Sequence, residues 1–177
     1  LFNEEESLPL LVVRLLEALR PLGRSFELVL VDDGSSDGTA EVLRELAATT
    51  PELVAVLLRR NYGQTPAMSA GFDVSRGRVI ITLDGDLQND PADIPMLLAQ
   101  LEQGFDLVSG WRHQRQDNAV SRLLPSKIAN RLIARVTDVQ LHDYGCSLKA
   151  YRRELVEDMN LYGELHRFLP ALAFIEG

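Results

Sequence analysis

An apolar run that ends in alternating aspartates constrains this chain more than any other feature. Val79–Ile81 leads directly into Thr82–Gln88, which holds Asp84, Asp86 and a terminal amide. The run predicts a buried parallel strand, and the turn residues after it place both carboxylates at its carboxyl end. Ligands bind at that end in open α/β sheets. Aspartates at alternate positions, with an amide two residues further on, are oxygen ligands that suit a hard divalent cation.

A second strand is predicted to end in the same way. Glu27–Val31 runs into Asp32, Asp33 and the turn Gly34–Ser35. One carboxylate here could accept hydrogen bonds from a base N–H or from ribose hydroxyls, but the same residues are also typical of a tight turn. Both interpretations can hold together. Two acidic strand ends beside one crevice predict a site for a metal and a phosphorylated ligand.

Length and charge limit the classes of function. The chain has 177 residues, a formal net charge of -8 and 46% hydrophobic residues, which fits one α/β domain. The negative charge argues against nucleic acid as a partner, because a phosphate backbone needs a basic face. Cys146 is the only cysteine, so no internal disulfide forms. No apolar stretch reaches the roughly 20 residues that a spanning helix needs.

Strand and helix patterns alternate along the chain and predict a single domain over residues 1–177, with a mostly parallel, helix-covered sheet. We see no repeat or linker, and we interpret the chain as an excised piece of a longer protein. The predicted strands are Glu27–Val31, Leu53–Leu58, Val79–Leu83, Phe105–Ser109 and Leu148–Tyr151. The predicted helices are Glu6–Leu19, one through Val42–Leu46 capped by Ser36 or Asp37, one around Ala67–Gly71, one from Pro91 to Leu101, Ser121–Val136, Arg152–Met159 and His166–Phe174.

Three residues that could bind a phosphate follow the predicted strand Phe105–Ser109. Arg112 comes directly after a predicted strand, while Arg122 and Ser126 are four residues apart and so share one face of a predicted helix. A guanidinium and a hydroxyl can clamp a phosphate, because the planar fork grips two oxygens at once. The alternative is solvated surface charge, which is the usual place of an arginine. Spacing alone leaves both open.

Taken together, these segments resemble the family-2 glycosyltransferases of the GT-A fold, and among them the polyprenyl-phosphate glycosyltransferases. The resemblance spans nearly the whole chain and implies an α/β, Rossmann-like GT-A domain. It rests on Phe2–Glu5, Val31–Thr39, Asn61–Gln64, Ala70–Phe72, Asp84–Gln88, Gly110–Arg112, Ser121–Arg122 with Ser126, and Asp143–Arg152.

The resemblance implies a role for each part of the site. Asp86 and Gln88 would hold Mg²⁺ or Mn²⁺. Asp86, Arg112, Arg122 and Ser126 would be the catalytic group, with the last three gripping an acceptor lipid phosphate. The residues implied to bind the nucleotide sugar are Phe2, Asn3, Glu5, Asp32, Asp33, Asp84 and Gly85.

The implied reaction is inverting transfer of a sugar from a nucleotide sugar, with a UDP-sugar favoured, to a polyprenyl phosphate at the cytoplasmic face of the membrane. The resemblance also implies that a first strand and a carboxyl-terminal membrane segment are missing here, and it allows a homo-oligomer. Three alternatives stay open: a soluble or polysaccharide acceptor, an inactive nucleotide-sugar-binding module, and a receiver-like signalling domain in which Lys149 would be the downstream lysine.

Overall fold

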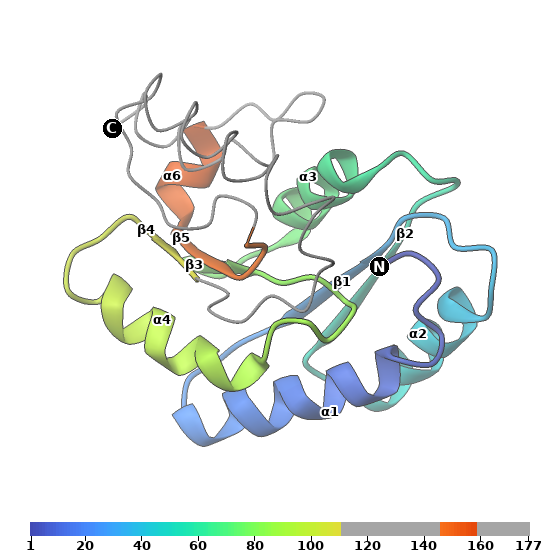
Figure 1. Ribbon diagram of the computed structural model, residues 1–177, viewed down its shortest axis with the longest axis horizontal. Helices are drawn as coiled ribbons and strands as arrows, with labels where there is room; N and C mark the ends of the chain where they lie inside the picture. Colours follow the sequence, from blue (N-terminus) through green and yellow to red (C-terminus); the bar gives the residue numbers. More distant parts are fainter. Residues whose placement is uncertain (111–145, 159–177) are drawn as a thin grey trace, which may run out of the picture.

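A computed structural model of the chain describes residues 1–110 and 146–158 (Figure 1). Strands and helices alternate as the sequence predicts. The strands are β1 (Leu28–Asp32), β2 (Leu53–Leu57), β3 (Val79–Thr82), β4 (Leu107–Ser109) and β5 (Lys149–Arg152). The helices are α1 (Leu8–Leu19), α2 (Thr39–Thr49), α3 (Gln64–Val74), α4 (Ile94–Leu101) and α6 (Arg153–Asp158), with 3₁₀ turns η1 (Arg20–Leu22) and η2 (Pro91–Asp93). The predicted helices Ser121–Val136 and His166–Phe174 lie outside the described residues.

The described strands form two sets. β1 pairs with β2 in parallel, with Leu28 opposite Leu53. β5 lies between β3 and β4 and runs antiparallel to both. Because both neighbours oppose β5, β3 and β4 run in the same direction as each other. The predicted short strand near Leu148 is therefore confirmed, and the structure adds its direction, which the sequence pattern did not carry.

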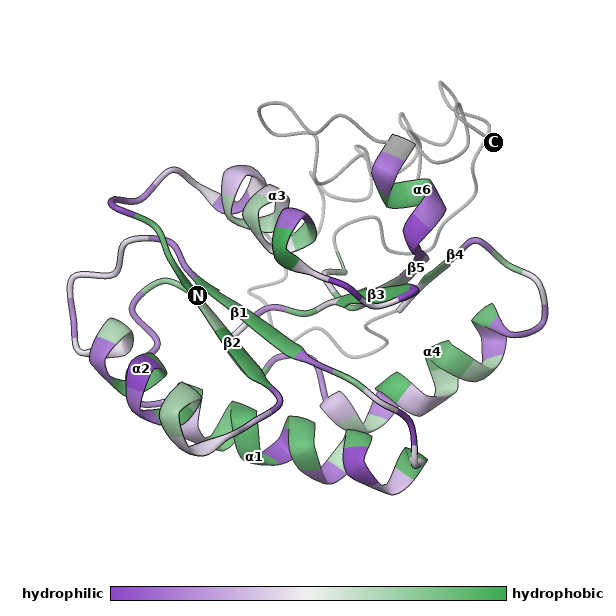
Figure 2. Cartoon of the chain, turned by 180° about the vertical axis from the view of Figure 1, so that it is seen from behind, coloured by the Kyte–Doolittle hydropathy of each residue, from purple (hydrophilic) through white to green (hydrophobic). Residues whose placement is uncertain are grey.

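Helices cover both faces of the strands. In Figures 1 and 2, α1, α2 and α4 lie on one face, while α3 and α6 lie on the other. Leu8, Leu11 and Leu15 of α1 recur at helical spacing and are buried in the main core, where Leu43 and Leu97 join them. A smaller cluster around Ile80, Tyr151 and Val156 lies under α3 and α6. Figure 2 shows β1 and β2 as mostly hydrophobic, as strands covered on both faces must be.

Element boundaries differ from the predicted ones by a few residues. The predicted cap of α2 at Ser36 or Asp37 is wrong in position, because the N-cap residue is Gly38. Asp37 nevertheless accepts a hydrogen bond from the Thr39 N–H at 3.0 Å. Pro91 opens a 3₁₀ turn rather than α4 itself, and Asp90 caps that turn by accepting from Ala92 N–H at 3.0 Å. A search of the helices in the described ranges for one with the length and hydropathy of a bilayer-spanning segment finds none.

Candidate nucleotide and metal site

The loop after β3 carries the acidic pair. Asp84 is partly buried, and its Oδ1 accepts a hydrogen bond from Gln64 Nε2 at 3.1 Å. Asp86 and Gln88 are exposed, and Asp86 Oδ1 accepts from the Gln88 N–H at 3.1 Å. This short turn places the Asp86 carboxylate and the Gln88 side chain on neighbouring positions of one loop, facing solvent.

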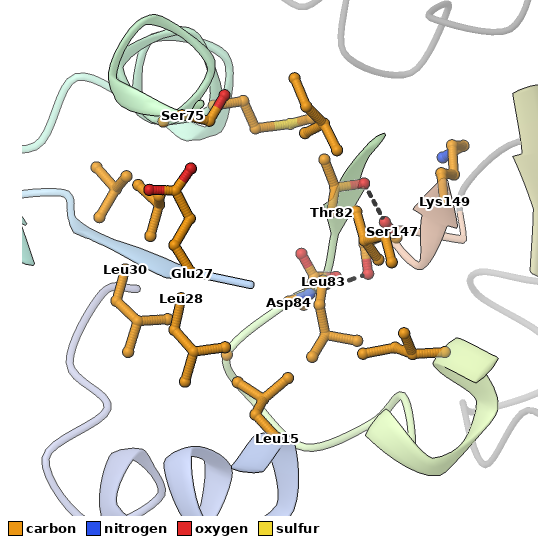
Figure 3. Close-up of a pocket in the computed structure, with 18 of the residues that line it drawn as sticks. Leu15, Glu27, Leu28, Leu30, Ser75, Thr82, Leu83, Asp84, Ser147 and Lys149 are labelled. Carbon is orange, nitrogen blue, oxygen red and sulfur yellow. Dashed lines mark hydrogen bonds between the residues drawn. The ribbon is translucent and has the colours of Figure 1, made fainter. Parts of the chain in front are cut away.

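Ser147 anchors this loop from a distant part of the chain (Figure 3). Its Oγ accepts hydrogen bonds from the Asp84 N–H at 3.3 Å and from Asn89 Nδ2 at 2.8 Å, and its carbonyl accepts from Thr82 Oγ1 at 2.6 Å. Asn89 is only 5% exposed, so its side-chain amide is held inside the fold. The acidic loop is therefore tied at both ends to the segment that leads into β5.

The loop after β1 uses its carboxylates internally. Asp33 is buried and accepts from the Tyr62 N–H at 2.8 Å and from the Gly63 N–H at 2.9 Å, one with each oxygen. Asp32 is buried as well, and its Oδ1 accepts from the Ser35 N–H at 3.2 Å and from the Ser35 hydroxyl. The turn interpretation of this pair is thus confirmed, while the contact with a nucleoside stays a prediction.

The amino-terminal residues are bonded to the same loop. Asn3 Oδ1 accepts from the Ser36 N–H at 2.9 Å, and Glu5 Oε2 accepts from the Gly38 N–H at 2.9 Å. Phe2 lies beside them and is 46% exposed. The structure therefore brings Asn3 and Glu5 next to the loop after β1, with Phe2 directly before them in the chain, while the contact of all three with a nucleotide stays a prediction.

One cavity joins the two acidic loops. It has a volume of about 1820 Å³, and Figure 3 shows part of its lining, from α1 on one side to α3 on the other. Near the carboxyl ends of β1 and β3, its lining includes Asp33, Asn61, Gln64, Asp84, Gly85, Asp86, Gln88 and Ser147. Elsewhere the cavity is lined by further charged residues, among them Glu27, Arg76, Arg78 and Lys149. The structure thus brings both acidic ends to one opening, as the sequence predicts.

The amino group of Leu1 lies at this cavity, where burial and nearby carboxylates act on its pKa in opposite directions. Burial lowers the pKa of the Leu1 amino group below its ordinary value of 8.0, although the carboxylates of Asp32, Asp33, Glu4 and Asp84 act to raise it. Desolvation outweighs the four carboxylates, which shows how far this group is withdrawn from water.

The acidic loop offers few side chains to a cation. In residues 1–110 and 146–158, no group of three or more His, Cys, Asp or Glu side chains is arranged to hold a metal. Mg²⁺ usually takes one or two protein carboxylates and completes its shell with water and phosphate. Exposed Asp86, with only the Gln88 N–H on its carboxylate among the described contacts, fits that sparse donor set.

The other predicted residues lie outside the described ones. Arg112, Arg122 and Ser126 belong to residues 111–145, so their positions relative to the cavity stay predictions. Sequence reasoning missed Gln64, Asn89 and Ser147 as partners of the acidic loop. Their residue types carry no signal for this role, because the contacts join segments about 20 to 63 residues apart, which only folding brings together.

The fold and the site define an α/β domain with a polar ligand opening at the carboxyl ends of its strands. Comparison with known proteins gives the family: residues 1–159 match the model for glycosyl transferase family 2, and the chain belongs to that family. The resemblance to family-2 glycosyltransferases is confirmed.

Two of the proteins similar to this chain are named for a polyprenyl phosphate. The chain is 49% identical over 173 residues to dodecaprenyl-phosphate galacturonate synthase of Rhizobium johnstonii, covering 97% of this chain and 51% of the relative. It is 51% identical over 173 residues to undecaprenyl-phosphate 4-deoxy-4-formamido-L-arabinose transferase of Pseudomonas paraeruginosa, again covering 97% and 51%. The chain thus spans about half the length of these relatives.

Solved structures support the fold. A mycobacterial protein aligns with a TM-score of 0.66 at 26% identity, covering 91% of this chain and 54% of that one. A mannosyltransferase from Pyrobaculum calidifontis, solved with GDP-Man and Mn²⁺, aligns with a TM-score of 0.66 at 22% identity, covering 92% and 45%. The α/β GT-A fold predicted from the sequence is confirmed.

Proposed function

We propose that this chain is the donor-binding part of an inverting glycosyltransferase that moves a sugar from a nucleotide sugar, with a UDP-sugar favoured, to a polyprenyl phosphate. Two relatives that are 49% and 51% identical to this chain are named for a polyprenyl phosphate. The name of the first also contains galacturonate, and the name of the second contains 4-deoxy-4-formamido-L-arabinose. The difference in sugar between them means that the polyprenyl phosphate is the shared element.

The observation that carries the proposal is the convergence of two acidic loops on one opening. Asp33 from the loop after β1 and Asp84 and Asp86 from the loop after β3 line the same cavity. A nucleoside diphosphate has a polar base and ribose at one end and a charged diphosphate at the other. Two separate polar loops that line one cavity suit such an elongated ligand.

On the nucleoside side, the proposal rests on residues 2–5 and the loop after β1. Asp33 and Asn3 fix the backbone of neighbouring loops, and exposed Phe2 offers an aromatic surface beside them. These contacts make a rigid frame before any ligand arrives, which lowers the ordering cost of binding. The full proposed set is Phe2, Asn3, Glu5, Asp32, Asp33, Asp84 and Gly85.

On the diphosphate side, Asp86 and Gln88 would hold Mg²⁺ or Mn²⁺. Bound there, the cation would supply positive charge against the charge that develops on the departing diphosphate. Asp84 would keep its position through its hydrogen bonds with Gln64 and Ser147. A solved glycosyltransferase of this fold was crystallised with Mn²⁺ and a nucleotide sugar, which supports the same pairing here.

On the acceptor side, we assign the lipid phosphate to Arg112, Arg122 and Ser126. An acceptor phosphate oxygen would attack the anomeric carbon from the face opposite the diphosphate, forming the new C–O bond while the old one breaks, so the anomeric configuration inverts. The phosphate is already anionic near neutral pH, so the step needs positioning and charge neutralisation rather than a strong general base. The lipid acceptor would place the full-length protein at the cytoplasmic face of a membrane.

The test compares two aspartates in full-length protein. Asp86→Asn should abolish transfer from UDP-sugars to undecaprenyl phosphate in the presence of Mn²⁺, because it removes the proposed cation's carboxylate. Asp93→Asn is the matched control, since Asp93 is exposed nearby on η2 and should leave transfer near normal. Normal turnover by Asp86→Asn would contradict the metal role, and transfer only to soluble acceptors would contradict the lipid acceptor.

A further inference from the structure

Leu87 has a backbone conformation that leucine rarely adopts. Its φ is 60°, and among the residues that the structure describes only one other non-glycine residue, Asn3, has a φ in the same region. Asparagine visits this region because its short polar side chain can hydrogen-bond locally, but in leucine the Cβ lies too close to the following carbonyl oxygen. Strained residues of this kind persist only where the surrounding structure holds them, and they cluster at ligand sites.

The place of Leu87 in the chain indicates what this strained turn does. Leu87 lies between Asp86 and Gln88, the two residues of the proposed cation site. The Gln88 N–H donates to Asp86 Oδ1 at 3.1 Å, so the carboxylate is folded back across Leu87. An ordinary negative φ at Leu87, with the neighbouring dihedral angles unchanged, would rotate this N–H away from the carboxylate. The left-handed turn therefore sets the relative positions of the two side chains.

Packing holds the turn in this conformation. The Leu87 side chain is partly buried and packs against the main core, whereas the residues on either side of it are exposed. The chain before and after the turn is also fixed, since Ser147 Oγ accepts from the Asp84 N–H and from the Asn89 side chain. Burial of one apolar side chain thus offsets the free-energy cost of the left-handed φ.

We infer that Leu87 is a positioning residue for the cation: burial of its side chain holds the loop in the left-handed turn that presents Asp86 and Gln88 together. The inference rests on the proposed metal role of these two residues. Because the turn is formed before the cation arrives, binding does not include the cost of ordering it, which raises the affinity for the cation. The Leu87 side chain has no oxygen or nitrogen, so it acts only through its neighbours.

The test separates packing from backbone strain by placing two small residues at Leu87. Alanine removes the packed side chain but keeps a Cβ, so the turn in Leu87→Ala should leave the left-handed region, whereas glycine adopts this region readily. In full-length protein with UDP, we expect Leu87→Ala to weaken Mn²⁺ binding by about tenfold and Leu87→Gly to weaken it less. Isothermal titration calorimetry measures both affinities. Leu87→Met keeps an apolar side chain of similar volume and should bind Mn²⁺ as the unchanged protein does.

A measurement without metal follows the turn directly. The Gln88 amide should lose its protection from hydrogen exchange in Leu87→Ala, because its acceptor on Asp86 moves away, and should keep part of it in Leu87→Gly. The matched control is Leu16→Ala. Leu16 is also partly buried against the main core, from α1, and it does not line the cavity. This control should lower the melting temperature and leave both the Mn²⁺ affinity and the Gln88 exchange unchanged.

Any one of three results would overturn the inference: unchanged Mn²⁺ binding in Leu87→Ala, a greater loss in Leu87→Gly than in Leu87→Ala, or an equal loss in Leu16→Ala. Asp86→Asn, measured alongside, tests the proposed function itself. If Asp86→Asn binds Mn²⁺ normally, the metal role of Asp86 fails and the inference fails with it. If Asp86→Asn loses Mn²⁺ binding and Leu87→Ala does not, only the role of Leu87 fails.

Discussion

At the scale of single residues, Gly34 shows why the loop after β1 has its shape. It has a φ of 67°, and a Cβ added there would lie 2.6 Å from the Asn61 nitrogen, with the Arg60 backbone closer still. We expect Gly34→Ala to lower the free energy of unfolding by about 2 kcal/mol or more, because the strained φ and the clash with backbone act together. Urea unfolding measures this, with Gly71→Ala as a control, since its Cβ would meet only the Val31 side chain at 3.4 Å. Equal losses in both variants would contradict the expectation.

The buried amino group of Leu1 makes the free energy of unfolding of the 177-residue chain depend on pH. Burial lowers its pKa in the folded state below the ordinary 8.0 that it regains on unfolding, so the unfolded chain binds more protons between the two values. The contribution of this group to the free energy of unfolding therefore rises with pH across that window and is complete above about pH 8. Urea unfolding at several pH values should show this slope, and acetylation of the amino group should remove it. An unchanged slope after acetylation would assign the effect to other groups.

At the scale of elements, the segment before β5 holds the loop after β3. Ser147 accepts from both the Asp84 N–H and Asn89 Nδ2. We expect Ser147→Ala to weaken use of the nucleotide sugar, raising KM for donor and Mn²⁺ about tenfold, because the loop loses the acceptor for two of its donors at once. Initial-rate kinetics of the full-length protein at varied donor and Mn²⁺ measure this.

The control for that variant is Thr49→Ala, which removes an exposed hydroxyl at the end of α2, from a residue that does not line the cavity. A fall in stability without a change in KM would make Ser147 a structural residue only. Rescue of KM by Ser147→Thr, which keeps the hydroxyl, would support the positioning role.

At the scale of the whole molecule, ligand and cation should act together on stability. A ligand that binds only the folded state at 100 times its Kd adds about 2.7 kcal/mol to the free energy of unfolding. We therefore expect UDP-sugar with Mn²⁺ to raise the melting temperature, and either one alone to raise it less, because Asp84 and Asp86 are proposed to contact both. Differential scanning fluorimetry with and without EDTA measures this. Equal shifts without Mn²⁺ would contradict joint binding.

Local sequence determined much of this fold. The apolar runs of β1 and β3 and the helical spacing of Leu8, Leu11 and Leu15 predict the alternating elements, because the 2.0 and 3.6 periods follow directly from backbone geometry. The acidic residues at strand ends predict one opening, since parallel strands end at one edge. These features depend on neighbours along the chain, so they can be read from it.

Tertiary structure decided what joins distant segments. Only the fold brings Ser147 to Asp84, turns Asp33 inward onto the loop at Tyr62, and sets β5 antiparallel between β3 and β4. A serine, an asparagine or a short strand carries no mark of its partner, because a hydrogen bond selects by position in space and many residues could supply it. The sequence by itself therefore determined the elements and the acidic strand ends, while packing decided which side chains hold them in place.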